Sequence, residues 1–124
     1  MMSSLAGLTL SEAQEGLTKG DFSSRELTES CLLAMENFRP LNAFITETPE
    51  RAMADAEMSD QRRAKGQVGA LEGLPIAIKD LFCTKGVAST ASSRILKEFV
   101  PTYESTVTEN LMSAGMVMLG KTNL

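Results

Sequence analysis

The chain has 124 residues, of which 43% are hydrophobic and 23% charged, and its formal net charge is -4 at pH 7. These values predict one soluble globular domain and exclude a disordered chain. The negative charge argues against a surface that coats nucleic acid. Because the sequence contains no histidine, these residues alone cannot build a Ser-His-Asp triad or a His-ligated metal site.

The sequence carries no signal for a membrane or for export. No apolar run approaches the roughly 20 residues of a membrane span. The N-terminus lacks the basic and long apolar segments of a signal peptide. We therefore predict a cytoplasmic protein with reduced cysteines. Cys31 and Cys83 show no metal-ligand spacing, so we expect no metal site.

Two capping boxes predict helices in the first third of the chain. Thr9 and Glu12 form the first box and Ser23 and Glu26 the second, and Pro40 closes the second helix. Apolar residues recur at helical spacing along this second helix, at Leu27, Cys31, Ala34, Met35 and Phe38. Cys31 lies on this stripe, which favours a small core residue over a reactive thiol.

A short strand is predicted over residues 42–46, followed by a third helix from Thr48 to about Lys65. Thr48 is expected to cap this helix, with Pro49 at its first position. We interpret the charged residues of its polar face as solvated, namely Arg51, Asp55, Asp60, Arg62 and Arg63.

The second half of the chain predicts a strand, a helix and a further strand. The most apolar strand, residues 74–78, ends on Lys79. A helix is expected over 106–114, with a capping box that begins at Thr106, and a buried strand over 116–119. This order resembles a βαβ unit, which predicts that the two strands are parallel.

Residues 115–122, GMVMLGKT, match the phosphate-binding pattern GxxxxGK[ST]. That motif needs a strand before its first glycine and a flexible loop between its glycines. Here a predicted helix precedes Gly115, and the four intervening residues are apolar and strand-forming. Backbone amides held in a sheet cannot surround a phosphate, so we reject nucleotide binding here and expect no cofactor in this chain.

Several separated motifs resemble the amidase signature family. They are GLPIAIKD at 73–80, LFCTKGV at 81–87, FVPTYESTV at 99–107 and VMLGKTN at 117–123, with LTLSE at 8–12 and LNAFIT at 41–46. Within the family they resemble the glutaminase subunits of tRNA-dependent amidotransferases, in a bacterial form. The resemblance covers essentially the whole chain.

The resemblance implies an α/β fold, the helix-rich N-terminal part of an amidase signature fold with helices packed on a mixed β-sheet. We expect a single incomplete domain over 1–124. Its helical part covers 1–66, and its strand-lysine-loop and βαβ-like part covers 67–124.

The family uses a Ser–cis-Ser–Lys triad, and the resemblance implies that Lys79 is its lysine. Both serines belong to a Ser/Gly-rich segment that has no counterpart in these residues. A general base must be neutral to accept a proton, and burial at a strand end would favour the neutral lysine. The adjacent Asp80 would favour the charged form, so we interpret Asp80 as structural.

The implied reaction is hydrolysis of glutamine to supply ammonia for converting Glu-tRNA(Gln) to Gln-tRNA(Gln). The implied partners are two other amidotransferase subunits in a heterotrimer, one of which uses ATP and Mg and handles the tRNA. No membrane is involved, and the 124 residues alone are expected to be inactive. The alternatives are a stand-alone amidase of the same family acting on another carboxamide, and an inactive interaction module.

The loop at residues 89–93, STASS, departs from the family. Relatives typically have glycine where Ser92 stands, and Ser92 is costly there if the position needs a positive φ. Ser93 matches the family's serine. It is expected either to support the lysine through a hydrogen bond or to structure the loop.

Overall fold

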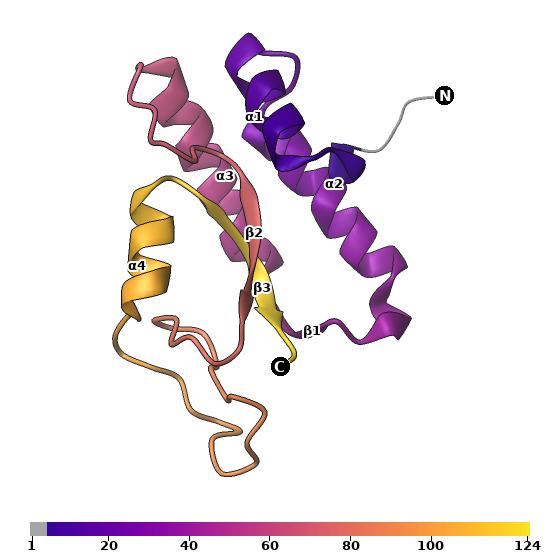
Figure 1. The fold of residues 1–124 in the computed structure, drawn as a ribbon, viewed down its shortest axis with the longest axis vertical. Coiled ribbons are helices and arrows are strands. Elements are labelled where there is room, and N and C mark those ends of the chain that lie inside the picture. The colour runs from indigo at the N-terminus through magenta and orange to yellow at the C-terminus, as the bar shows by residue number, and fades with distance from the viewer. Residues whose placement is uncertain (1–4) are drawn as a thin grey trace.

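Helices cover both faces of a small mixed sheet in the computed structural model, which describes residues 5–124 (Figure 1). The sheet has the order β1-β3-β2, with strands Phe44–Glu47 (β1), Pro75–Lys79 (β2) and Val117–Thr122 (β3). Strands β2 and β3 are parallel, and β1 runs antiparallel to β3. The predicted α/β fold, mixed sheet and parallel pair are confirmed.

In residues 5–124, four α-helices pack around this sheet. They are Leu10–Lys19 (α1), Ser24–Asn37 (α2), Pro49–Ala64 (α3) and Thr106–Ser113 (α4). Short 3-10 turns occupy Leu5–Gly7 and Arg39–Leu41. Helices α2 and α3 pack together on one side of the sheet, while α4, which connects β2 to β3, lies on the other side (Figure 1).

Both capping boxes predicted in the first third of the chain are confirmed. The Thr9 hydroxyl accepts a hydrogen bond from Glu12 N at 3.2 Å, and the Glu12 carboxylate accepts one from Thr9 N at 2.9 Å. Ser23 and Glu26 exchange the same two bonds, each at 3.1 Å. These bonds satisfy backbone donors that the first helical turn leaves free.

Two other predicted caps differ from the structure. Thr48 is the N-cap residue of α3 and Pro49 its first residue, as predicted, but the Thr48 side chain makes no capping bond and its hydroxyl donates to Met118 O in β3 at 3.3 Å. The N-cap of α4 is Ser105, one residue before the predicted Thr106, and its hydroxyl accepts from Thr108 N at 3.2 Å.

The interpretation of the α3 charges as solvated is wrong for part of the helix. The Asp60 carboxylate accepts hydrogen bonds from Ser24 N at 2.8 Å and Arg25 N at 3.1 Å. It thereby covers the positive end of α2, where a negative charge is favourable. Arg62 is paired with the buried Glu72 at 2.8 Å. This polar face lies against α2 and the turn before β2.

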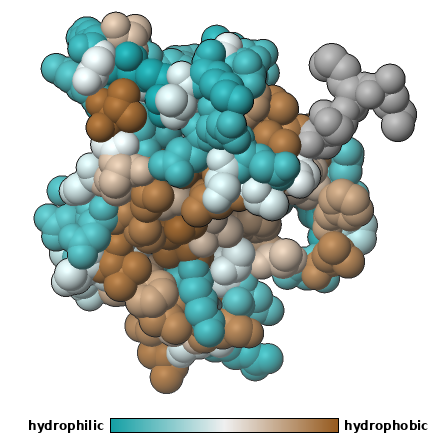
Figure 2. All heavy atoms as spheres, turned by 45° about the horizontal axis from the view of Figure 1, so that its top comes forward, coloured by the Kyte–Doolittle hydropathy of each residue, from teal (hydrophilic) through white to brown (hydrophobic). Residues whose placement is uncertain are grey.

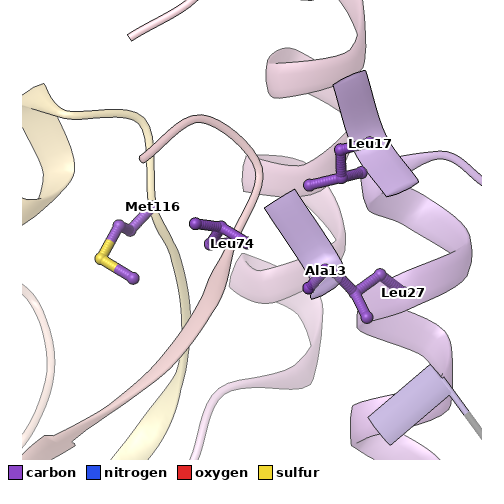
Figure 3. Close-up of a cluster of buried hydrophobic side chains, with 5 residues drawn as sticks. All are labelled: Ala13, Leu17, Leu27, Leu74 and Met116. Atoms are coloured by element: carbon purple, nitrogen blue, oxygen red, sulfur yellow. The ribbon is translucent and has the colours of Figure 1, made fainter. Parts of the chain in front are cut away.

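The hydrophobic core consists of three clusters on the two faces of the sheet. The first joins helices α1 and α2 to the residues that precede β2 and β3 (Figure 3), namely Ala13, Leu17, Leu27, Leu74 and Met116. The second packs Ala52 and Ala56 of α3 against Val117 and Leu119 of β3. The third lies on the α4 side and contains Ile78, Val87 and Met118.

Considerable apolar surface stays exposed. Figure 2 shows hydrophobic residues across the middle of one face, below a more hydrophilic upper part. Large apolar side chains are exposed at Leu41 (73%) and Ile95 (94%). Phe38, expected at the end of the α2 stripe, lies one residue beyond the end of α2 and is 65% exposed. Strands β1 and β2 are the sheet's two edges, and an unpaired edge exposes backbone donors and acceptors. Within 5–124, no helix is long and apolar enough to cross a membrane.

Candidate active site

Lys79 is the last residue of β2 and lies opposite Thr122 in the parallel pair with β3. The preceding residue, Ile78, is buried in the α4-side cluster, so the alternation of the strand directs Lys79 to the other face. Lys79 is exposed. The burial that would favour a neutral lysine is therefore not supplied by residues 5–124 themselves.

Asp80 directly follows and is 1% exposed. Its carboxylate accepts hydrogen bonds from the Thr90 backbone N at 3.1 Å and the Thr90 hydroxyl at 2.5 Å. Its backbone N donates to Thr122 O at 3.0 Å, and its carbonyl accepts from Ala91 N at 3.1 Å. Asp80 thus ties the end of β2 to both β3 and the loop that returns at residue 90. This agrees with its interpretation as a structural residue.

Sequence reasoning missed Lys121, the largest fully buried side chain of the described residues. Its ammonium group donates to Phe82 O at 2.6 Å and to the Ser89 hydroxyl at 2.9 Å, and lies 3.6 Å from Asp80 Oδ1. Burial lowers the pKa of Lys121, and the Asp80 charge opposes this by raising it. The predicted strand over 116–119 ended too early to include Lys121. The sequence does contain a signal for its burial, because Lys121 continues the apolar run that begins at Met116.

The phosphate-binding interpretation stays rejected on structural grounds. The residues between the two glycines do not form a loop, because β3 occupies Val117–Thr122 and pairs on both sides. A helix, α4, precedes the first glycine, Gly115. The lysine of the motif is the buried Lys121, whose amino group is already bonded within the protein.

In the loop beside Asp80, Ser92 has the positive φ that makes a serine costly where relatives typically have glycine. Ser92 has a φ of 59° and the preceding Ala91 a φ of 49°. Both lie in the left-handed region, which favours glycine. The Ser92 hydroxyl donates to Asn123 Oδ1 at 3.0 Å, and its backbone N donates to the Thr90 hydroxyl at 3.3 Å. These bonds partly offset the backbone strain.

Ser93 has a role inside the loop. Its hydroxyl accepts a hydrogen bond from Ile95 N at 3.2 Å, and its backbone N donates to Thr90 O at 2.8 Å. Both bonds are short-range and stabilise a turn. They favour the loop-structuring alternative for Ser93 over direct support of Lys79.

The remaining candidate groups do not form a second site in the part of the chain that is described. No group of three or more His, Cys, Asp or Glu residues there could hold a metal ion. Cys31 is half-buried and packs against two of the core clusters. Burial raises the pKa of its thiol, which agrees with a core residue and not with a reactive one.

Comparison with known proteins finds matches to amidases along almost the whole chain. The amidase family model matches residues 26–124. The chain is 58% identical over 123 residues to the A subunit of glutamyl-tRNA(Gln) amidotransferase from Hyphomonas neptunium, covering 99% of this chain and 25% of the relative. It is 58% identical over 120 residues to the corresponding protein of Rhodospirillum rubrum, covering 97% of this chain and 24% of that one. The chain thus spans about a quarter of the length of these curated relatives.

Solved structures also share the fold. A peptide amidase from Stenotrophomonas maltophilia superposes with a TM-score of 0.88 at 31% identity, covering 96% of this chain and 25% of that one. A bacterial aryl acylamidase described as an amidase signature enzyme gives a TM-score of 0.88 at 30% identity, covering 98% of this chain and 26% of the other.

Proposed function

Because the chain belongs to the amidase signature family, we propose that it forms the N-terminal part of the glutaminase subunit of a glutamyl-tRNA(Gln) amidotransferase. The observation that carries this proposal is the identity of 58% to the A subunits of such enzymes along almost the whole chain. The proposed protein is cytoplasmic and works in a heterotrimer with two other subunits.

In the proposed reaction, Lys79 is the base of a Ser–cis-Ser–Lys triad whose two serines lie outside these 124 residues. Neutral Lys79 accepts a proton from the bridging serine, which in turn takes the proton of the nucleophilic serine. That serine attacks the side-chain amide of glutamine, forms a glutamyl ester and releases ammonia. Water then hydrolyses the ester to glutamate and restores the serine.

The position of Lys79 supports this role. Its side chain stands at the open end of an edge strand and is exposed in residues 5–124. A further part of the protein could cover it there, which would supply both the serines and the desolvation that favours a neutral amine. The ammonia would pass to a partner subunit that uses ATP and Mg to activate Glu-tRNA(Gln).

A stand-alone amidase is the second candidate, favoured by the superposition on peptide amidase and aryl acylamidase structures. Their identity of 30–31% is much lower than the 58% to the amidotransferase subunits, so the fold fits both functions and the sequence favours the first.

Co-expression of the full-length protein with its two partner subunits tests the proposal. We expect glutamine- and ATP-dependent formation of Gln-tRNA(Gln) by the complex, and no amidase activity from residues 1–124 alone. Hydrolysis of a peptide amide or aryl amide by the full-length protein without partners, and no Gln-tRNA(Gln) with them, would instead establish the stand-alone amidase.

A further inference from the structure

One row of side chains crosses the sheet where β2 and β3 end. Thr122, the last residue of the central strand β3, lies directly opposite Lys79 of β2 in the parallel pair. On its other side Thr122 lies opposite Phe44 of β1 in the antiparallel pair. Residues opposite each other in neighbouring strands point to the same face, and the strands are about 4.8 Å apart. The register therefore sets the Thr122 side chain next to the point where the Lys79 side chain leaves the backbone.

The packing of the neighbouring residues identifies the face to which this row points. Phe44 packs against the second core cluster, on the α3 side of the sheet. The preceding pair, Ile78 and Lys121, points to the α4 side, where Ile78 belongs to the third cluster and Lys121 bonds to the loop after β2. Alternation along both strands then places Lys79 and Thr122 together on the α3 side.

The backbone of this row is fixed, whereas its polar side chains are not engaged. Thr122 O accepts a hydrogen bond from Asp80 N at 3.0 Å, and Lys79 O accepts one from Phe82 N at 3.1 Å. Thr122 is half-buried, and neither its hydroxyl nor the Lys79 amine has a hydrogen-bond partner among residues 5–124. Because threonine is branched at Cβ, its hydroxyl has few positions, while the four-carbon stem of lysine is flexible.

A lysine that acts as a base needs a partner of this kind. Proton transfer requires the nitrogen lone pair to point at the proton that it removes. A carboxylate would hold the amine but would favour its protonated form. A hydroxyl can accept one N–H of the neutral amine and leaves the lone pair free. Because the hydroxyl is uncharged, it favours the protonated form far less than a carboxylate does.

We infer that Thr122 is a positioning residue for the amide hydrolysis, whose hydroxyl accepts a hydrogen bond from the Lys79 amine and directs its lone pair toward the bridging serine. The inference rests on the proposed function of Lys79. Loss of the hydroxyl leaves the amine present but free to adopt many orientations. The rate of the chemical step then falls while glutamine still binds, and the hydroxyl has nothing to contribute once the amine is removed.

The test is the steady-state kinetics of glutamine hydrolysis by the full-length complex. Thr122→Val keeps the branched shape and removes the hydroxyl, so we expect kcat to fall about tenfold and KM to change less than about twofold. Thr122→Ser keeps the hydroxyl and should restore most of kcat. In the Lys79→Ala background, Thr122→Val should cause no further loss. Gln-tRNA(Gln) formation from added ammonium should be unchanged in all of these variants.

The matched control is Thr46→Val, which removes the hydroxyl of another half-buried strand threonine, one that lies opposite Lys121 and not Lys79. It should leave kcat unchanged. If Thr122→Val fails to fold, Thr122→Ala carries the same test with the same expectation.

Three results would overturn the inference. They are a kcat of the folded Thr122→Val complex within a factor of about two of the wild type, Thr122→Ser as slow as Thr122→Val, and a further tenfold loss in the Lys79→Ala background. Normal turnover in Lys79→Ala would instead defeat the proposed function.

Discussion

The two ends of β2 each carry a buried carboxylate, and they are held in different ways. Before the strand, Glu72 is 4% exposed and receives hydrogen bonds from Ser59 at 2.6 Å, Arg62 at 2.8 Å and Gly69 N at 3.2 Å. After the strand, one oxygen of Asp80 has no hydrogen-bond partner among residues 5–124, and it faces the buried Lys121 amino group at 3.6 Å.

This difference separates a fully hydrogen-bonded carboxylate from one whose pairing is incomplete. Around Glu72 both carboxylate oxygens are satisfied, and the cluster joins α3 to the turn before β2. Around Asp80 the pairing is incomplete, and the exposed Lys79 lies next to it in the chain. A fully satisfied network rigidifies the elements that it joins.

Glu72→Ala should give the largest loss of stability. The change leaves Ser59, Arg62 and Gly69 N without their acceptor, and we expect the free energy of unfolding to fall by about 3 kcal/mol. Urea unfolding of the full-length protein, wild type and variant side by side, measures this. A matched exposed acid, Glu15→Ala, should change it little. If the free energy of unfolding of Glu72→Ala falls by less than about 1 kcal/mol, the Glu72 cluster is not the stabilising end of β2 that we describe.

Gly115→Ala should strain the same cluster from the opposite side. A Cβ atom at Gly115 would lie 2.5 Å from Glu72 Oε2, and the φ of +95° disfavours any side chain. We expect a loss of about 2 kcal/mol in the free energy of unfolding. Gly7→Ala is the control, since a Cβ there meets nothing within 4 Å. Equal stability of the two alanine variants would show that Glu72 can move freely.

The stability that Glu72 provides should depend on pH. Burial raises the pKa of its carboxyl group, but hydrogen bonds from Arg62, Ser59 and Gly69 outweigh burial and leave the pKa lowered. A lowered folded pKa gives stability that is present above the unfolded pKa and is lost as the pH falls through the folded pKa.

The difference in unfolding free energy between wild type and Glu72→Gln should therefore shrink on acidification from neutral pH. Urea unfolding at a series of pH values measures it. A difference that stays constant down to acid pH would mean that hydrogen bonding, and not ionisation, provides the stability.

Ser92→Gly should have the smallest effect. Glycine relieves the left-handed strain at a φ of 59°, but it loses the bond to Asn123 and increases the freedom of the unfolded chain. We expect a gain of less than about 1 kcal/mol. The same urea measurement tests this, and a clear loss of stability would mean that the Ser92–Asn123 bond is worth more than the strain.

Patterns that depend on near neighbours could be predicted from the sequence. The capping boxes join residues three apart, and the βαβ order follows from the predicted elements between 74 and 119. Lys79 was predicted through its resemblance to the family motif. The structure gives its exposed position at the end of β2.

Contacts between distant segments could not be predicted. Asp60 caps a helix that begins 36 residues earlier in the chain, and Lys121 bonds to Ser89, 32 residues away. No local pattern distinguishes Asp60 from a solvated charge, whereas Lys121 continues an apolar strand. Lys121 also belongs to the match to the phosphate-binding pattern, but the strand geometry excludes phosphate binding there. The burial of the Lys121 side chain follows from the pairing of β3 with β2.

The most direct test of the central claim is glutamine hydrolysis by the full-length complex carrying Lys79→Ala, with Lys85→Ala as the matched exposed control. We expect kcat to fall by at least about a hundredfold in the first variant, because Lys79 is the proposed base, while the variant still folds. Gln-tRNA(Gln) formation from added ammonium should persist. Glutamine turnover within a factor of about two of the wild type would contradict the account, because a general base contributes far more than that.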